Sequence, residues 1–187
     1  MYNVVLNDTA TQLDPTLTAS VGGIPFSING VHTKVGFLYF TNTALGFFRV
    51  SIFHDGIPVG NVEVLAKFTS RDGFTFDSAG DAFVVRGGID LIRMITPAGR
   101  MVSLDYENPD ALVLIEGDTV AKFGSTKSDR RILYVTTNGR YTRLVNRTDV
   151  QGSKILARDL REGLSGVYCS CSRWLNLIFT SVIYFSL

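Results

Sequence analysis

The sequence predicts an all-β protein, built as an antiparallel β-sandwich or a barrel-like sheet with one short C-terminal helix. Three observations predict this class. The 187 residues include 13 Phe and 7 Tyr, and aromatic residues favour strands. Short apolar runs alternate with polar positions, which is the period of a half-buried strand. Turn-forming pairs separate these runs at the spacing expected of a sandwich or barrel.

Four Asx-Gly pairs mark the expected turns: Asn29-Gly30, Asp55-Gly56, Asp72-Gly73 and Asn138-Gly139. Such pairs tolerate the positive φ angles of tight hairpins. We expect strands between the turns, over residues 31–40, 46–53, 61–68, 82–85, 89–95, 101–106, 111–115, 131–137 and 140–146. The last two strands flank Asn138-Gly139 and form the clearest predicted hairpin.

One helix is predicted, over residues 153–164. Ser153 is a good N-cap residue, Leu156, Leu160 and Leu164 recur every four residues, and Gly166 lies just beyond the expected end. No predicted strand alternates with a helix of ten or more residues. A parallel α/β sheet is therefore not expected.

Charge divides the chain into two parts, although its net charge is only +1. Residues 1–118 hold seven Lys and Arg against 13 Asp and Glu, a net charge of −6. Residues 119–187 hold 11 against four, a net charge of +7. We interpret 1–118 as an acidic β-sandwich body and 119–187 as a basic hairpin, a short helix and an apolar tail. One continuous domain is the alternative.

The basic hairpin supplies the first set of candidate partner-binding residues: Arg130, Arg131, Arg140, Tyr141, Arg143 and Arg147. Three interpretations stay open. These side chains form a solvated surface, they contact the acidic part of a neighbouring copy, or they hold nucleic-acid phosphates with an aromatic ring among the cations.

The apolar tail, residues 174–187, supplies the second set: Trp174, Leu177 and Phe179. A helix of this length is shorter than a bilayer core. The tail completes the protein's own core, buries itself in another subunit, or contacts a membrane. A free apolar end favours association.

The sequence contains no motif that would identify a catalytic site. The P-loop, the dinucleotide fingerprint and the nucleophile elbow are all missing, and the only histidines are His32 and His54. Cys169 and Cys171 lack a second ligand pair for zinc. We therefore predict no catalytic residue, no metal and no cofactor. Without an N-terminal signal peptide, we expect an intracellular protein or one assembled in a particle.

One family resemblance rests on two motifs within residues 50–105. Gly56-Ile57-Pro58-Val59-Gly60-Asn61-Val62-Glu63-Val64 is followed by Phe76-Asp77-Ser78-Ala79-Gly80-Asp81-Ala82-Phe83. This order resembles the carboxypeptidase-regulatory (transthyretin-like) and bacterial immunoglobulin-like modules. The resemblance implies a non-catalytic sandwich used for attachment or assembly, and it nominates no active-site residue.

These observations together predict a non-catalytic structural or interaction module that docks to itself or to another structural subunit. A virus or phage particle component fits this character. The alternatives are a nucleic-acid-binding module that uses the hairpin of residues 131–147, a carbohydrate-active or carbohydrate-binding β-protein, and a protein anchored in a membrane by its tail.

Overall fold

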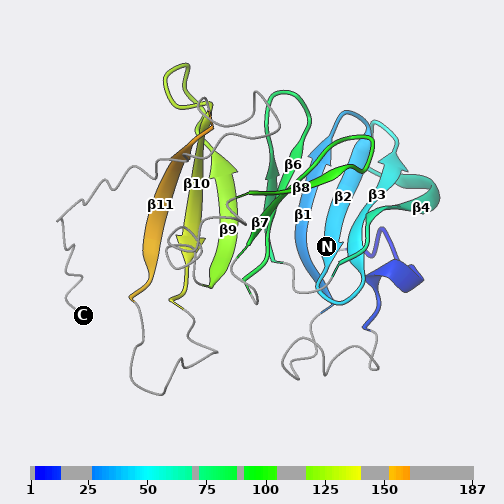
Figure 1. Ribbon diagram of the computed structural model, residues 1–187. Coiled ribbons are helices and arrows are strands. Elements are labelled where there is room, and N and C mark those ends of the chain that lie inside the picture. Colours follow the sequence, from blue (N-terminus) through cyan, green and yellow to red (C-terminus); the bar gives the residue numbers. More distant parts are fainter. Residues whose placement is uncertain are drawn as a thin grey trace, which may run out of the picture.

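Three antiparallel sheets make up the part of the chain that the computed structural model describes, residues 3–13, 27–68, 72–87, 91–104, 117–139 and 152–160 (Figure 1). Sheet A contains β1 (Ile28–Lys34), β2 (Phe37–Asn42), β3 (Gly46–Ile52) and β4 (Pro58–Ala66). Sheet B contains β5 (Phe74–Phe76), β6 (Ala82–Val85), β7 (Ile92–Ile95) and β8 (Met101–Leu104). Sheet C contains β9 (Asp118–Phe123), β10 (Ile132–Thr137) and β11 (Lys154–Asp159).

Within each sheet, strands that follow one another in the sequence are hydrogen-bonded neighbours. Their orders are β1-β2-β3-β4, β5-β6-β7-β8 and β9-β10-β11. This up-and-down order differs from an immunoglobulin-type sandwich, in which Greek-key connections cross between two sheets. In the described residues, the only helical element is the 3-10 turn η1 (Thr9–Thr11).

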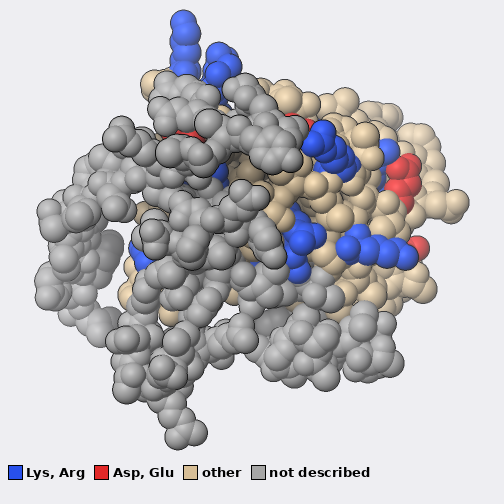
Figure 2. Space-filling model, in the orientation of Figure 1, with Lys and Arg blue, Asp and Glu red and all other residues tan. Residues whose placement is uncertain are grey.

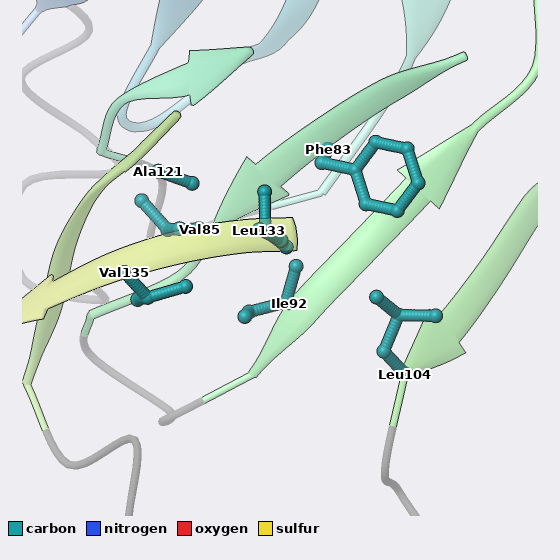
Figure 3. Close-up of a cluster of buried hydrophobic side chains, with 7 residues drawn as sticks. All are labelled: Phe83, Val85, Ile92, Leu104, Ala121, Leu133 and Val135. Carbon is teal, nitrogen blue, oxygen red and sulfur yellow. The ribbon is translucent and has the colours of Figure 1, made fainter. Parts of the chain in front are cut away.

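Sheet B lies between sheets A and C and packs against both of them (Figure 1). All four residues of β6 are buried. Because alternate side chains of a strand point to opposite faces, both faces of β6 must be covered. Phe83 and Val85 join a cluster with residues of sheet C (Figure 3). Ala82 and Val84 join a second cluster with Phe47 of sheet A. The continuous apolar run of β6 therefore reflects burial on two sides.

The first strands of the three sheets lie next to one another, since β5 contacts both β1 and β9. Gly30 permits the close approach of β1 to β5. A Cβ atom at this position would lie 3.0 Å from Cδ1 of Phe74 and 3.1 Å from Oγ1 of Thr41. The chain therefore needs its smallest residue where the two sheets meet.

The all-β, antiparallel class is confirmed, but the predicted C-terminal helix is wrong. The structure has β11 where the helix was expected, and residues 161–164 lie outside the described part. Leu156 and Leu160 are four residues apart, and four is a multiple of the strand period as well as about one helical turn. Such a spacing fits both elements. In the structure these residues form a strand because they pair with β10.

The predicted hairpin around Asn138-Gly139 is also wrong. One edge of β10 pairs with β9 and the other pairs with β11, from Ile132 to Thr137. Both edges of β10 are therefore occupied, and residues 140–146 lie outside the described part. The Asn138-Gly139 pair suggested that β10 pairs with the residues that follow it. In the structure, β10 pairs instead with β9, which precedes it, and with β11.

The predicted turn at Asn29-Gly30 lies inside β1, at an irregularity in the pairing of β1 with β2. The chain turns instead at Val35-Gly36, where both residues have positive φ angles, so the strand expected over 31–40 is two strands. Among the other expected strands, 46–53 and 82–85 correspond closely to β3 and β6. The strand expected over 111–115 lies outside the described residues.

We expect Leu133→Ala to lower the free energy of unfolding by about 3 kcal/mol, because Leu133 is fully buried between sheets B and C. Val31→Ala is the matched control, since Val31 is exposed on β1 and should change stability by less than about 0.5 kcal/mol. Urea denaturation measures both. Equal effects of the two substitutions would contradict the stacking described here.

Candidate functional site

Polar side chains gather where the first strands of the three sheets begin. Asn29 lies near the start of β1, Asp72 just before β5, and Asp118 is the first residue of β9. Thr41 of β2 and Arg86, which follows β6, complete a set that we name the inner-strand rim. Backbone bonds tie this end together, including Gly73 N–H to the Thr119 carbonyl at 3.0 Å.

Asp72 is the group with the most distinctive environment at the rim. Burial raises the pKa of its carboxyl, while a hydrogen bond from the Asn29 side chain and one from the Gly73 backbone oppose that shift. The Thr41 hydroxyl donates a hydrogen bond to the backbone carbonyl of Asp72 at 3.0 Å. The same hydroxyl oxygen, Oγ1 of Thr41, accepts a hydrogen bond from Gly30 N–H at 2.8 Å. A half-buried carboxyl with a raised pKa is suited to donate or accept a proton or hydrogen bond.

Arg86 and Asp118 place buried charges of opposite sign beside Asp72. The backbone N–H of Arg86 donates to Oδ2 of Asp118 at 2.9 Å, and both residues are buried. Burial, and next the charge of Arg93, lower the pKa of Arg86 to about 10, while Asp118 acts in the opposite direction. Arg86 and Arg93 lie over the Phe68 ring, 5.1 and 5.5 Å from its centroid. Both buried charges, one positive and one negative, therefore lie at this end of the stack.

An aromatic wall extends from the rim along β1 and β5. The His32 ring is exposed, and its centroid lies 4.8 Å from that of Phe74 and 6.4 Å from that of Phe76. Tyr39 meets Phe76 edge-on at 4.7 Å. Lys34 places Nζ 4.8 Å from the Phe76 centroid and donates to the Asp77 carbonyl at 2.8 Å. Such a wall can bind a planar unsaturated group while His32 and Lys34 supply hydrogen bonds.

Of the nine residues predicted to bind a partner, the structure describes two. Arg130 and Arg131 are exposed in the connection between β9 and β10, and Figure 2 shows basic side chains projecting from that end of the molecule. The other seven lie outside the described residues: Arg140, Tyr141, Arg143, Arg147, Trp174, Leu177 and Phe179. Their roles, and the proposed partners, stay predictions.

Sequence reasoning missed the rim because it favoured a turn role for Asn29 and Asp72 and did not consider Arg86 and Asp118 as a pair. A detectable signal was present. Asn29, Asp72 and Asp118 are 43 and 46 residues apart, and each lies near the start of the first strand of its sheet. Self-similarity at such a period indicates a repeated sheet unit.

No group of three His, Cys, Asp or Glu side chains suited to a metal ion occurs within the described ranges. Asp77 instead closes a turn, because its Oδ1 accepts bonds from the backbone N–H groups of Ala79, Gly80 and Asp81, each at 2.9 Å. In the same ranges, no helix has the length and apolar character needed to cross a membrane.

Comparison with known proteins gives one relative in sequence. The chain is 29% identical over 141 residues to "Putative hetero-Diels-Alderase" from Phoma sp, a match that covers 73% of this chain. The match covers 39% of the length of that protein. No family model matches the chain.

Three solved structures that resemble the chain each have a TM-score below 0.5. A calcium-binding protein, regucalcin, from Agrobacterium tumefaciens has a TM-score of 0.45 and 23% identity, covering 61% of this chain and 38% of its own. Luciferin-regenerating enzyme has a TM-score of 0.48 and 17% identity, covering 70% and 44%. Virginiamycin B lyase from Staphylococcus aureus has a TM-score of 0.43 and 14% identity, covering 73% and 42%.

These comparisons correct two predictions. The relative in sequence is not a transthyretin-like or immunoglobulin-like protein, and the up-and-down strand order also differs from that class, so the family resemblance is wrong. The prediction of a non-catalytic structural or virion module is also wrong, because the relative that matches in sequence carries the name of an enzyme. Turn-rich β-proteins share short motifs, and the motif overlap here reflected shared turn chemistry.

We expect Asp72→Asn to change how stability depends on pH. Burial raises the pKa of Asp72 above its ordinary value of 3.8, so the folded state holds this proton where the unfolded state has lost it. The native protein therefore loses stability as pH rises from 3.8 through the folded pKa. Urea denaturation across this range should show the variant gaining stability relative to the native chain as pH rises.

Asn29→Ala is the companion variant for this measurement. The Asn29 hydrogen bond lowers the pKa of Asp72, so its loss should enlarge the pH-dependent loss of stability. A stability difference between Asp72→Asn and the native chain that stays constant with pH would contradict the buried setting of this carboxyl.

Proposed function

We propose that this chain is part of an enzyme with a β-propeller-type fold. Two consecutive four-stranded sheets, each an up-and-down meander, stack face to face and bring their first strands together. Four-stranded sheets arranged around a common axis are the blades of a propeller. The recurrence of Asn29, Asp72 and Asp118 at 43 and 46 residues supports the same architecture.

The proposed activity is a hetero-Diels-Alder cycloaddition. The observation that carries it is the 29% identity to the Phoma protein over 141 residues. The match includes 73% of this chain, and so exceeds what one shared turn motif would give.

This reaction depends more on how the two reacting groups are positioned than on acid or base catalysis. A conjugated diene and a double bond that contains a heteroatom join into a six-membered ring. Two σ bonds form, two π bonds are consumed in net terms, and no atom or proton leaves. A protein can accelerate such a step by holding both partners in the reactive orientation. It can also donate a hydrogen bond to the heteroatom, where negative charge develops in the transition state.

The aromatic wall and the rim provide groups for both tasks. The rings of Phe76 and Tyr39, with His32 beside them, would hold the planar diene. His32 and the Asn29 amide would donate to the heteroatom, and Asp72 would also donate when protonated. Burial of Asp72 favours that protonated form.

The test is to incubate the chain with an achiral compound in which a conjugated diene is tethered to an aldehyde. We expect loss of the diene absorbance, a product of unchanged mass, and an excess of one enantiomer. The uncatalysed reaction of an achiral compound gives equal amounts of both. Racemic product formed at the background rate would contradict the proposal.

The two histidines form a matched pair for this assay. His32→Ala should lower the enantiomeric excess, because the ring lies on the aromatic wall. His54→Ala should leave it unchanged, because His54 is exposed in the turn between β3 and β4. Equal losses in the two variants would place the reaction elsewhere on the protein.

A further inference from the structure

The start of β1 contains a β-bulge. Two residues of β1, Asn29 and Gly30, lie opposite one residue of β2, Thr41, where the register of the two strands shifts. A bulge leaves a backbone group unpaired in the ladder and redirects a side chain, and bulges are frequent beside functional sites. The residue concerned here is Asn29, whose exposed side chain hydrogen-bonds to the Asp72 carboxyl.

The Thr41 hydroxyl links this bulge to the segment before β5. Thr41 is fully buried, with 0% of its surface exposed. Its Oγ1 accepts the Gly30 N–H at 2.8 Å and donates to the Asp72 carbonyl at 3.0 Å. A Cβ atom on Gly30 would lie 3.1 Å from the same oxygen, so the glycine leaves room for the hydroxyl. One hydroxyl therefore joins the backbone next to Asn29 to the backbone of Asp72.

Hydrogen bonds to the rest of the stack hold the Asp72 backbone independently of Thr41. The Asp72 N–H donates to the Val85 carbonyl at 3.1 Å, and the next N–H, that of Gly73, donates to the Thr119 carbonyl at 3.0 Å. Loss of the Thr41 hydroxyl would therefore leave Asp72 in place while the bulge becomes free to move relative to it.

We propose that Thr41 is a positioning residue, whose hydroxyl holds the bulge so that the Asn29 side chain meets the Asp72 carboxyl. The inference rests on the proposed function, in which these two side chains donate hydrogen bonds to the heteroatom. Because Thr41 is buried, it acts through Asn29 and not on the reacting groups.

The pKa of the Asp72 carboxyl reports this arrangement. Burial raises that pKa, whereas the hydrogen bonds from Asn29 and Gly73 lower it. A bulge that no longer holds Asn29 against the carboxylate should therefore raise the pKa further.

Charged groups on the neighbouring elements have other partners. Lys34 of β1 interacts electrostatically with Asp81. Arg86, which follows β6, interacts with Asp118 of β9. A change in the pKa of Asp72 can therefore be assigned to its own hydrogen bonds and burial.

The experiment is a carboxyl-carbon NMR titration of the full chain, which measures the pKa of Asp72 without a substrate. Thr41→Val removes the hydroxyl at nearly constant volume, and we expect it to raise this pKa by about half a pH unit or more. Thr41→Ser keeps the hydroxyl and should give the native value. In the Asn29→Ala background, Thr41→Val should cause no further rise, because its effect passes through Asn29.

Thr137→Val is the matched control. Thr137 is another buried threonine, and its Oγ1 accepts a backbone N–H, that of Lys154, at 3.3 Å. Its replacement should leave the pKa of Asp72 unchanged. If Thr41→Val does not fold, Thr41→Ala leaves room for water beside the freed backbone groups and should show the same dependence on Asn29. An equal rise with and without Asn29, or no rise at all, would overturn the proposal.

The enantiomeric excess separates this inference from the cycloaddition itself. Thr41→Val should lower the excess, and Thr41→Ser should retain it. Racemic product from the native chain would contradict the cycloaddition and leave the NMR titration as an independent test of the positioning role. A rise in the Asp72 pKa that does not depend on Asn29 would overturn the positioning role, whatever the excess.

Discussion

The burial of β6 on both faces is the interaction on which the rest of the structure depends. Its four residues send alternate side chains into two separate apolar clusters, one shared with sheet C and one with sheet A. Each neighbouring sheet therefore buries one of its faces against this strand and those beside it. Removal of apolar surface from water is the main favourable term in folding. The same packing fixes where the first strands of the three sheets begin.

The inner-strand rim follows from that packing. Close approach of the strands buries the side chains of Arg86 and Asp118 and partly buries Asp72. Burial of charge is costly unless partners compensate, and here the Arg86 backbone N–H, Asn29 and Gly73 contribute those partners. Ionisable residues whose burial is unfavourable are frequently found at functional sites. The aromatic wall adds a surface for planar groups next to these polar ones.

The sequence predicted what alternation and composition determine locally. The apolar run at 82–85 was found because all four of its side chains are buried, and the strand at 46–53 because most of its side chains are apolar. β11 was missed because leucines four residues apart satisfy a helix and a strand equally. Arg158 belongs to the basic part of the sequence, yet it is buried on the inner face of β11, where burial lowers its pKa to about 10. The rim was missed because its members come from three sheets, and only their 43- and 46-residue spacing links them in the sequence.

Native-state hydrogen exchange on the β6 amides tests the central claim, that sheet B is packed on both faces, most directly. Strands in the middle of a stack exchange only when the whole domain unfolds, whereas strands with an exposed face open locally. We expect the amides of residues 83–85 to exchange more slowly than those of β4 and β11. The free energy of opening measured for these amides should equal the free energy of global unfolding. Exchange of β6 at the rate of β4 or β11 would contradict the three-layer arrangement, and with it the placement of the rim.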